Sequence, residues 1–380
     1  MNKSPKFFPK IVACMAVIGL SSMCQPAAAT LFSQHNLVTD DQSANTADVT
    51  DPNLKNAWGM SSSPSSPFWI SDNGTGLSTL YRVTPQNDTV TKVGLEVSIP
   101  GDGSVTGQVF NSAGAGHFNG DNFLFVSEDG TVSGWRGALG TSAETLVTGS
   151  ADNVYKGTAF ATIGGNSYLY AANFHTGNID VVKGNAAAPN LPGNFTDPNL
   201  PAGFAPFNVQ HLGDALYVTY AKQGAGKDDE KGLGNGFVNK FDLQGNLIKR
   251  IASQGALNSP WGLALAPSTF AEFANALLVG NFGDGRINAF DPTTAAFLGQ
   301  LQGISGNPLE IDGLWGLSVG NNGNGGSPDR LYFTAGPNDE ANGLFGVLQA
   351  QVPELTTFPL LSAALLSYVI TRKRAVSRLA

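Results

Sequence analysis

The chain has 380 residues, of which 47 are Gly, 21 are Pro and only 13% are charged. Residues 30–350 hold 14 of the 21 Lys and Arg but 28 of the 29 Asp and Glu, so this segment carries a net charge of −14. Such a surface repels nucleic acid phosphates and anionic lipids, which argues against a nucleic acid partner or a headgroup-binding role. The composition is typical of short strands joined by tight turns.

Residues 1–29 are predicted to be a secretory signal peptide. Three lysines in the first ten residues precede an apolar stretch at 11–20, and three alanines at 27–29 supply the small side chains that signal peptidase accepts. Modification of Cys24 as a lipoprotein is the alternative, although the bulky Met23 before it is unfavourable. Because both cysteines, Cys14 and Cys24, lie in this leader, the exported protein has no internal disulfide.

Six similar units follow one another in residues 30–350. One reads "NSPWGLALAP" and then "ALLVGNFGDGRINAFDPTTAAFLGQL" from Asn258 to Leu301, and its relatives begin at Asn56, Gly116, Tyr155, Phe204 and Asp312. Each unit has an aromatic residue or His, usually beside Gly, and then strands separated by polar turns. Roughly 53 residues per unit, slightly more than a propeller blade of about 40 to 45, predict an all-β, six-bladed β-propeller. No segment shows a sustained helical period.

The N-terminal strand is predicted to close the ring. The last unit has three strands, the third at residues 345–349, and lacks a fourth. Residues 32–39 form an orphan strand that can supply it. Such a closure removes two exposed sheet edges at once.

One rim of the propeller gathers the candidate binding residues. If the four strands of a blade run outward from the channel as A, B, C and D, the segments entering A and the turns joining B to C share a rim. The candidates on this rim are Trp58, Asn73, Glu128, Asn173, His175, Trp261, Asn281, Asp284 and Trp315. Asn, Asp and Gly also suit tight turns for purely structural reasons, and this alternative stays open.

The first residues of the six A strands form a separate set. They are assigned as Trp58, His117, Tyr155, Phe207, Trp261 and Trp315. Rings at these positions can form a platform at the channel mouth, because Trp and Tyr combine apolar area with a polar group. The repetition itself favours the other interpretation, in which the rings are packing wedges between blades.

Catalytic patterns are sparse. Residues 316–320 match G-x-S-x-G, but Ser318 is expected inside strand A of a blade, and a nucleophile elbow needs a strand-to-helix turn. His117 and His175 are the histidines placed to converge as bases. The loop at 224–236 carries Asp228 and Asp229, and is either solvated, closed over the mouth, or a Ca²⁺ site.

Residues 351–380 are predicted to be a sorting or transmembrane segment, and the chain's only contact with a membrane. A Pro-Glu pair at 353–354 precedes sixteen mostly apolar residues, 355–370, and a basic cluster at 372–374. The apolar run is at the short limit for a membrane span. This arrangement resembles the PEP-CTERM sorting tail, which implies an exosortase as a partner, although Leu355 stands where that motif has a second proline.

The phrases "NLVTDD", "NAWGM", "NSPWGLALAP", "GNFGDGRINAFDP", "DGLWGL" and "FTAGPNDE" cover nearly the whole of the exported chain. They resemble a family of exported bacterial six-bladed propellers with NHL-like repeats, which often bear the PEP-CTERM tail. The resemblance implies a location in the outer envelope, at the cell surface or in the medium. It implies no established reaction.

Two function classes follow. The first is a binding propeller that holds an exopolysaccharide, another matrix component or a surface protein on the rim. The second is a hydrolase similar to the gluconolactonase and paraoxonase-like lactonases, in which Ca²⁺ in the channel acts as a Lewis acid. For that class the ligands to test are Asn73, Asn173, Asn281 and Asp312, with His117 or His175 as base.

Overall fold

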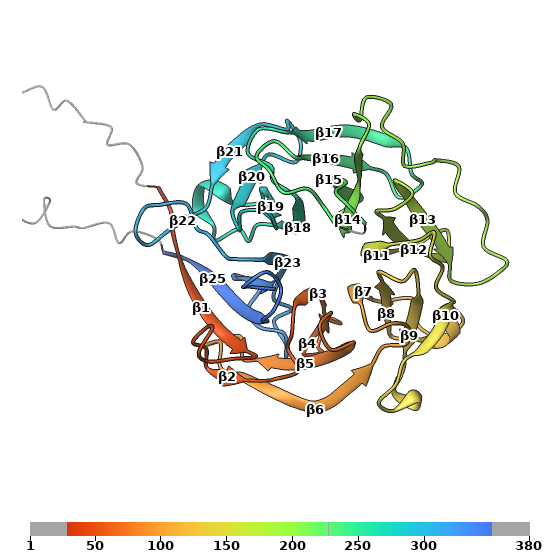
Figure 1. The fold of residues 1–380 in the computed structure, drawn as a ribbon, viewed down its shortest axis with the longest axis horizontal. Coiled ribbons are helices and arrows are strands. Elements are labelled where there is room, and N and C mark those ends of the chain that lie inside the picture. Colours follow the sequence, from red (N-terminus) through yellow and green to blue (C-terminus); the bar gives the residue numbers. More distant parts are fainter. Residues whose placement is uncertain (1–28, 227, 352–380) are drawn as a thin grey trace, which may run out of the picture.

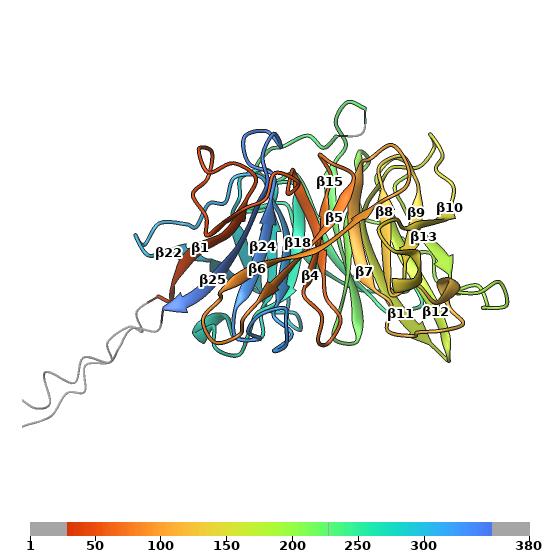
Figure 2. The same cartoon turned by 90° about the horizontal axis from the view of Figure 1, so that it is seen from below.

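The fold is a six-bladed β-propeller, as predicted. The structure, a computed structural model, describes residues 29–226 and 228–351. Six sheets stand around a central channel (Figure 1), and their connecting loops gather on two opposite rims (Figure 2). The described part of the chain contains three helical elements, all single 3-10 turns: η1 (Phe118–Gly120), η2 (Gly137–Leu139) and η3 (Ala271–Phe273).

Each blade is antiparallel, and its first strand lines the channel. Blade 1 consists of β3 (Ala57–Ser61), β4 (Phe68–Asp72), β5 (Leu77–Val83) and β6 (Val90–Ser98). Blade 2 consists of β7 (Val105–Phe110), β8 (Phe123–Ser127), β9 (Val132–Trp135) and β10 (Glu144–Val147). Blade 3 consists of β11 (Tyr155–Ile163), β12 (Asn166–Asn173) and β13 (Asn178–Lys183).

The other three blades complete the ring. Blade 4 consists of β14 (Phe204–Leu212), β15 (Ala215–Lys222), β16 (Gly236–Phe241) and β17 (Leu247–Ser253). Blade 5 consists of β18 (Pro260–Leu265), β19 (Leu277–Asn281), β20 (Ile287–Phe290) and β21 (Phe297–Gln300). Blade 6 consists of β23 (Leu314–Val319), β24 (Leu331–Ala335), β25 (Leu344–Gln351) and β1 (Leu31–Thr39).

The predicted closure by the N-terminal strand is confirmed. β1 pairs antiparallel with β25 from Leu31 opposite Gln351 to Thr39 opposite Leu344. Two short strands, β2 (Val49–Thr50) and β22 (Gln302–Gly303), pair parallel with β1. The first and last described segments of the chain therefore share one sheet, and the ring has no gap between blades 6 and 1.

The hydrophobic core lies between neighbouring blades. The second strand of blade 1, β4, is buried at every position, because the sheets on both sides cover it. The outermost strand β6 includes exposed residues, because it faces solvent. The core therefore forms a series of layers around the channel, and the innermost strands approach one another most closely.

Glycine permits this close approach. An added Cβ atom at Gly59 would lie 2.6 Å from the Thr106 carbonyl oxygen of the next blade, and one at Gly107 would lie 2.7 Å from the Thr158 nitrogen. Since real Cβ atoms do not approach so closely, a side chain at either position would force the blades apart. The recurrent pair of an aromatic residue and Gly in the sequence therefore has a packing cause.

One strand assignment made from the sequence was wrong. The first strand of blade 2 is β7, which carries Thr106 and Gly107, whereas His117 lies between β7 and β8 on the opposite rim. In blade 3 Tyr155 begins the first strand, as predicted, and Lys156 stands between it and the strand's Gly. The error in blade 2 came from searching for aromatic or His side chains, because Thr106 occupies the equivalent position.

Residues 1–28 and 352–380 lie outside the described part of the chain. The signal peptide over residues 1–29 and the tail over 351–380 therefore stay predictions, except that Gln351 belongs to β25. No helix within residues 29–226 and 228–351 is both long enough and apolar enough to span a bilayer.

Candidate functional site

The turns that join the second and third strands of each blade lie on one rim, which we call the top face. They follow β4, β8, β12, β15, β19 and β24, and they include every turn that was expected there. The first strand of each blade also begins at this face. Loops and strand starts from all six blades therefore surround the same mouth of the channel.

A cavity of about 240 Å³, the top pocket, opens at this mouth. Its lining residues are Trp58, Glu128, Lys156, Asp228, Asp229, Lys231, Phe282, Trp315 and Glu340. Every blade contributes at least one of them. The connection between β15 and β16 supplies Asp228, Asp229 and Lys231. Of the conformations expected for this acidic loop, the structure thus has one in which the loop reaches the mouth.

Aromatic rings close the channel beneath the top pocket. The ring centroids of Trp58 and Trp315 are 3.7 Å apart, and those of Trp315 and Phe282 are 3.8 Å apart, both in stacked geometry. Trp261 meets Trp58 and Trp315 edge-on, at 6.3 and 5.8 Å. The rings thus pack on one another across the channel, and three of them also line the top pocket.

Two lysines flank this stack. The Nζ atom of Lys156 lies 5.1 Å from the Trp58 ring centroid, and that of Lys231 lies 4.2 Å from the Phe282 centroid. The Lys156 side chain is only 3% exposed and forms an ion pair with Glu128, which is 15% exposed. A buried ammonium group is tolerated here because a carboxylate and an aromatic face both compensate its charge.

The Glu340 carboxylate is held in a poorly solvated position. Asn56 Nδ2 donates to Glu340 Oε2 over 2.6 Å, and Trp315 Nε1 donates to Asn56 Oδ1 over 3.0 Å. Burial raises the pKa of Glu340, and the Asn56 hydrogen bond offsets part of this rise.

Asp229 is the least satisfied of these groups. Burial raises the pKa of its carboxyl group, and the nearby Ser259 hydroxyl lowers this pKa in part without reaching hydrogen-bond geometry. Its Oδ2 atom is buried and has no hydrogen-bond partner among the described residues. A ligand that donates a hydrogen bond there would relieve the cost of this burial.

The structure gathers some of the predicted rim residues and separates others. Trp58, Glu128 and Trp315 line the top pocket, and Asn73 Nδ2 donates to Glu128 Oε2 over 3.4 Å. Trp261 lies in the aromatic stack and outside the lining.

Asn173, His175, Asn281 and Asp284 lie on turns of the same face but do not line the pocket. Asn173 donates to Asn153 and Asp180 over 2.9 and 2.8 Å, and Asn281 donates to Asp284 Oδ1 over 3.0 Å. His175 is exposed. The amides of Asn173 and Asn281 are thus held within their own blades.

Six lining residues were not among the binding candidates: Lys156, Asp228, Asp229, Lys231, Phe282 and Glu340, although Asp228 and Asp229 were considered in a Ca²⁺ loop. Lys156 and Phe282 had a signal in the sequence. Lys156 precedes the inner-strand Gly157, as Trp58 precedes Gly59, and Phe282 follows the last residue of a second strand, as Asn73 does in blade 1.

The Ca²⁺ ligand set considered from the sequence does not fit the geometry. None of Asn73, Asn173, Asn281 and Asp312 lines the top pocket, the Asn173 Oδ1 atom accepts the Val154 backbone N–H over 3.2 Å, and Asp312 Oδ2 accepts the Asn338 backbone N–H over 2.8 Å. Across residues 29–226 and 228–351 there is no group of three or more His, Cys, Asp or Glu side chains arranged to hold a metal. His117 and His175 lie on opposite rims, so they cannot act together on one substrate.

We expect calcium to have no effect on thermal stability. A resident ion that binds only the folded state would raise the melting temperature by mass action, and chelation would lower it. The melting temperature should change by less than about 1 °C between 5 mM EDTA and 5 mM CaCl₂, followed by circular dichroism. In a domain of this size, a stabilisation of 1 kcal/mol raises the melting temperature by about 2–4 °C. A higher melting temperature in CaCl₂ would therefore be visible and would support a metal site.

The fold and the top pocket define a class: a six-bladed β-propeller with a charged, aromatic-floored pocket at one channel mouth.

The chain is 30% identical over 326 residues to "Uncharacterized protein R648" of Acanthamoeba polyphaga mimivirus, and the match spans 80% of this chain and 76% of that protein. It is also 30% identical over 316 residues to "Uncharacterized protein L690" of the same virus, spanning 78% and 81%. The chain therefore belongs to the family of these proteins. No protein family model matches it.

A solved structure with a TM-score above 0.5 shows the same fold at low identity. The α-L-arabinofuranosidase Arb93A from Fusarium graminearum, in a variant bound to an iminosugar inhibitor, is 12% identical with a TM-score of 0.51 and matches 84% of this chain and 98% of that one. The PQQ-bound aldose sugar dehydrogenase from Streptomyces coelicolor is 14% identical with a TM-score of 0.49, and matches 86% and 100%. This likeness concerns the fold alone.

Proposed function

We propose that the protein is an exported binding propeller whose top pocket takes a positively charged group of its ligand. The observation that carries this proposal is the charge of the pocket, which holds four carboxylates against two ammonium groups. Glu128 is already paired with Lys156, whereas Asp229 keeps a buried oxygen without a partner among the described residues. A protonated amine or a guanidinium group would complete both the charge balance and the hydrogen bonding.

The size of the pocket limits what enters it. A cavity of about 240 Å³ is smaller than the roughly 300 to 1,000 Å³ of typical ligand pockets. It therefore admits one residue or one sugar unit of a larger ligand. The aromatic floor supplies apolar contact for the carbon skeleton of that unit. We favour a glycan or other matrix component with free amino groups, ahead of a basic segment of a surface protein.

The proposed location rests on the two ends of the sequence. The leader with its three alanines supports export through signal peptidase, and the Pro-Glu pair, apolar run and basic cluster support a sorting tail of the PEP-CTERM kind. On this proposal the protein belongs to the exported bacterial propellers, an exosortase processes its tail, and it acts in the outer envelope, at the cell surface or in the medium. Cell fractionation with antibodies against the propeller and the tail tests both steps.

A matched pair of probes tests the ligand class. A glucosamine hexamer and its fully N-acetylated counterpart differ mainly in six amino groups, and we expect only the glucosamine hexamer to bind in calorimetric titrations. Asp229→Asn and Glu340→Gln should each weaken this binding about tenfold, which is about 1.4 kcal/mol. Because both replacements keep the size of the side chain, their melting temperatures serve as the control for folding. Equal binding of the two hexamers would contradict the proposal.

Binding should depend on pH through the same carboxylates. A cation binds the ionised form, and burial raises the pKa of Asp229 and of Glu340. Affinity for the glucosamine hexamer should therefore fall as the pH drops, beginning above the usual carboxyl range near 4. In Glu340→Gln the fall should be shallower, because one titrating group is lost. Titrations between about pH 4 and 5.5, where the amines of the hexamer stay protonated, would show a constant affinity if the carboxylates were not involved.

A further inference from the structure

The opposite mouth of the channel holds a second cavity, of about 300 Å³, which we call the bottom pocket. It is lined by the later residues of the inner strands β3, β7, β11, β14 and β23, which all run from the top face to the bottom face. The polar groups used below are Ser61, Gln108, Thr158, Gln210, His211 and Ser318. Five blades thus contribute to one concave site.

The bottom pocket contains no charged side chain. Hydroxyl, amide and imidazole groups line it together with apolar groups, among them Phe110 and Phe160, and no Asp, Glu, Lys or Arg is present in the lining. An ion entering such a site would lose its hydration without an opposite charge in return. The lining therefore favours a neutral ligand, in contrast to the top pocket.

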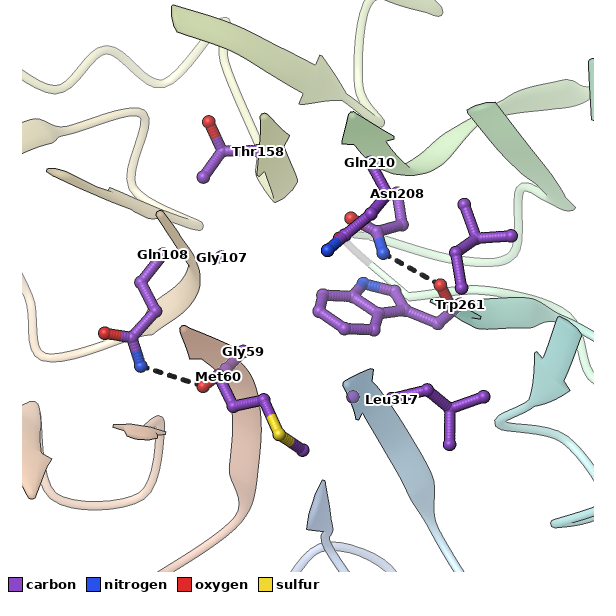
Figure 3. A pocket seen from close by; sticks show the side chains of 11 residues that line it. Gly59, Met60, Gly107, Gln108, Thr158, Asn208, Gln210, Trp261 and Leu317 are labelled. Carbon is purple, nitrogen blue, oxygen red and sulfur yellow. Dashed lines mark hydrogen bonds between the residues drawn. The ribbon is translucent and has the colours of Figure 1, made fainter. Parts of the chain in front are cut away.

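The two pockets are separated within the channel. Between them lies a constriction of about 10 Å³, which is about the space that one water molecule needs. Figure 3 shows this narrow part, where Gln108, Thr158 and Gln210 surround the channel beside the Trp261 ring. A ligand at the bottom mouth therefore meets side chains that a ligand at the top does not touch.

Several polar groups in the bottom pocket are left free to bind. The Gln210 amide makes no hydrogen bond with any described residue, and Figure 3 shows it pointing into the channel. The Ser61 hydroxyl is buried and has no partner in the described part of the chain. Gln108, in contrast, is fixed by donating from Nε2 to the Gly59 carbonyl oxygen over 2.9 Å.

His211 supplies an acceptor. Its Nδ1 atom lies 2.9 Å from the Phe160 carbonyl oxygen, and because a carbonyl only accepts, Nδ1 carries the hydrogen. In the neutral ring Nε2 then has a free lone pair. Ser318, which matches G-x-S-x-G, lies within β23 as expected and donates to the Val319 carbonyl oxygen over 3.1 Å, so it adds a hydroxyl to the lining and is not set on a nucleophile elbow.

We propose that the bottom pocket binds a neutral, hydroxyl-rich ligand of about one monosaccharide. Ligand hydroxyls both donate and accept, which matches the free Gln210 amide, the Ser61 hydroxyl and the His211 Nε2 lone pair. The rings of Phe110 and Phe160 offer apolar contact for C–H groups. A volume of about 300 Å³ lies at the lower end of the range for small-molecule sites.

The test uses the full chain and a panel of free sugars followed by NMR: glucose, galactose, mannose and N-acetylglucosamine, with glucuronate and galacturonate as negatively charged counterparts. At least one neutral sugar should bind saturably in the millimolar range, and the charged counterparts at least tenfold more weakly. Gln210→Leu should weaken neutral binding at least tenfold. Gln34→Leu, at an exposed glutamine of β1, is the matched control and should leave binding within twofold.

A second variant distinguishes weaker binding from misfolding. Ser61→Ala removes a hydroxyl that is unpartnered in the described structure, so it should leave the melting temperature unchanged or higher and still weaken the sugar about threefold or more. Glu340→Gln, in the top pocket, should leave neutral-sugar binding within twofold, which separates this inference from the proposed function. The inference fails if no neutral sugar saturates, if charged sugars bind equally well, or if Ser61→Ala and Gln210→Leu bind like the unaltered chain.

Discussion

A chain that lacks residues 30–40 is expected to remain unfolded. Deleting β1 removes the outer of the two strands that pair with β25 and reopens the ring between blades 6 and 1. It also removes Leu37 and Val38, which are fully buried, and Phe32, whose ring centroid lies 5.0 Å from that of Phe270. Far-ultraviolet circular dichroism should show loss of the β signal, and size exclusion should show an expanded or aggregated chain.

Point variants measure how much the packing of β1 side chains stabilises the fold without shortening the chain. Phe32 is 1% exposed, so Phe32→Ala should lower the free energy of unfolding by about 3 to 5 kcal/mol, the usual cost of deleting a buried Phe side chain. Gln34→Ala, at an exposed position of the same strand, should change it by no more than about 0.5 kcal/mol. Urea unfolding measures both values. If the deletion variant folds with an intact cooperative transition, the ring does not depend on its N-terminal strand.

The repeated sequence pattern was sufficient to predict the propeller, because the pattern itself results from a packing constraint on the blades. Each inner strand must approach its neighbours closely, so Gly59 and Gly107 occur at equivalent places in their blades. Blade 4 departs from this rule with Asn208, whose Nδ2 atom donates to the Trp261 carbonyl oxygen over 2.8 Å. The Gly was thus the informative residue of the repeated pair. The residue before it varies, and this explains why the first strand of blade 2 was misassigned.

The top pocket was harder to predict because its parts come from unrelated signals. Trp58 and Trp315 were found from the repeats, and Glu128 from its turn. Lys156 was missed because lysine is rarely buried, and nothing local shows that Glu128 compensates it. The place of Asp229 depends on how a long insertion folds back, here through a bridge between Gln223 and Asp229. Such a fold-back has no periodic pattern in the sequence.

Breaking the buried ion pair between Lys156 and Glu128 is expected to destabilise the fold strongly. Lys156→Met is expected to lower the free energy of unfolding by about 3 to 5 kcal/mol at pH 7, because it leaves the Glu128 carboxylate largely buried without its counter-charge. The variant also loses the ammonium group over the Trp58 ring. Glu128→Gln should be costly for the converse reason, since the Lys156 side chain is only 3% exposed.

A double-mutant cycle distinguishes this pairing from simple loss of packing. The variant that combines Lys156→Met with Glu128→Gln should be less destabilised than the sum of the two single variants, since neither charge is then left alone. Lys231→Met is the matched control, because Lys231 also lies over a ring of the top pocket but is exposed, and it should cost less than about 1 kcal/mol. Urea unfolding at pH 7 gives all four values. Additive effects would mean that the two charges are stabilised independently of each other.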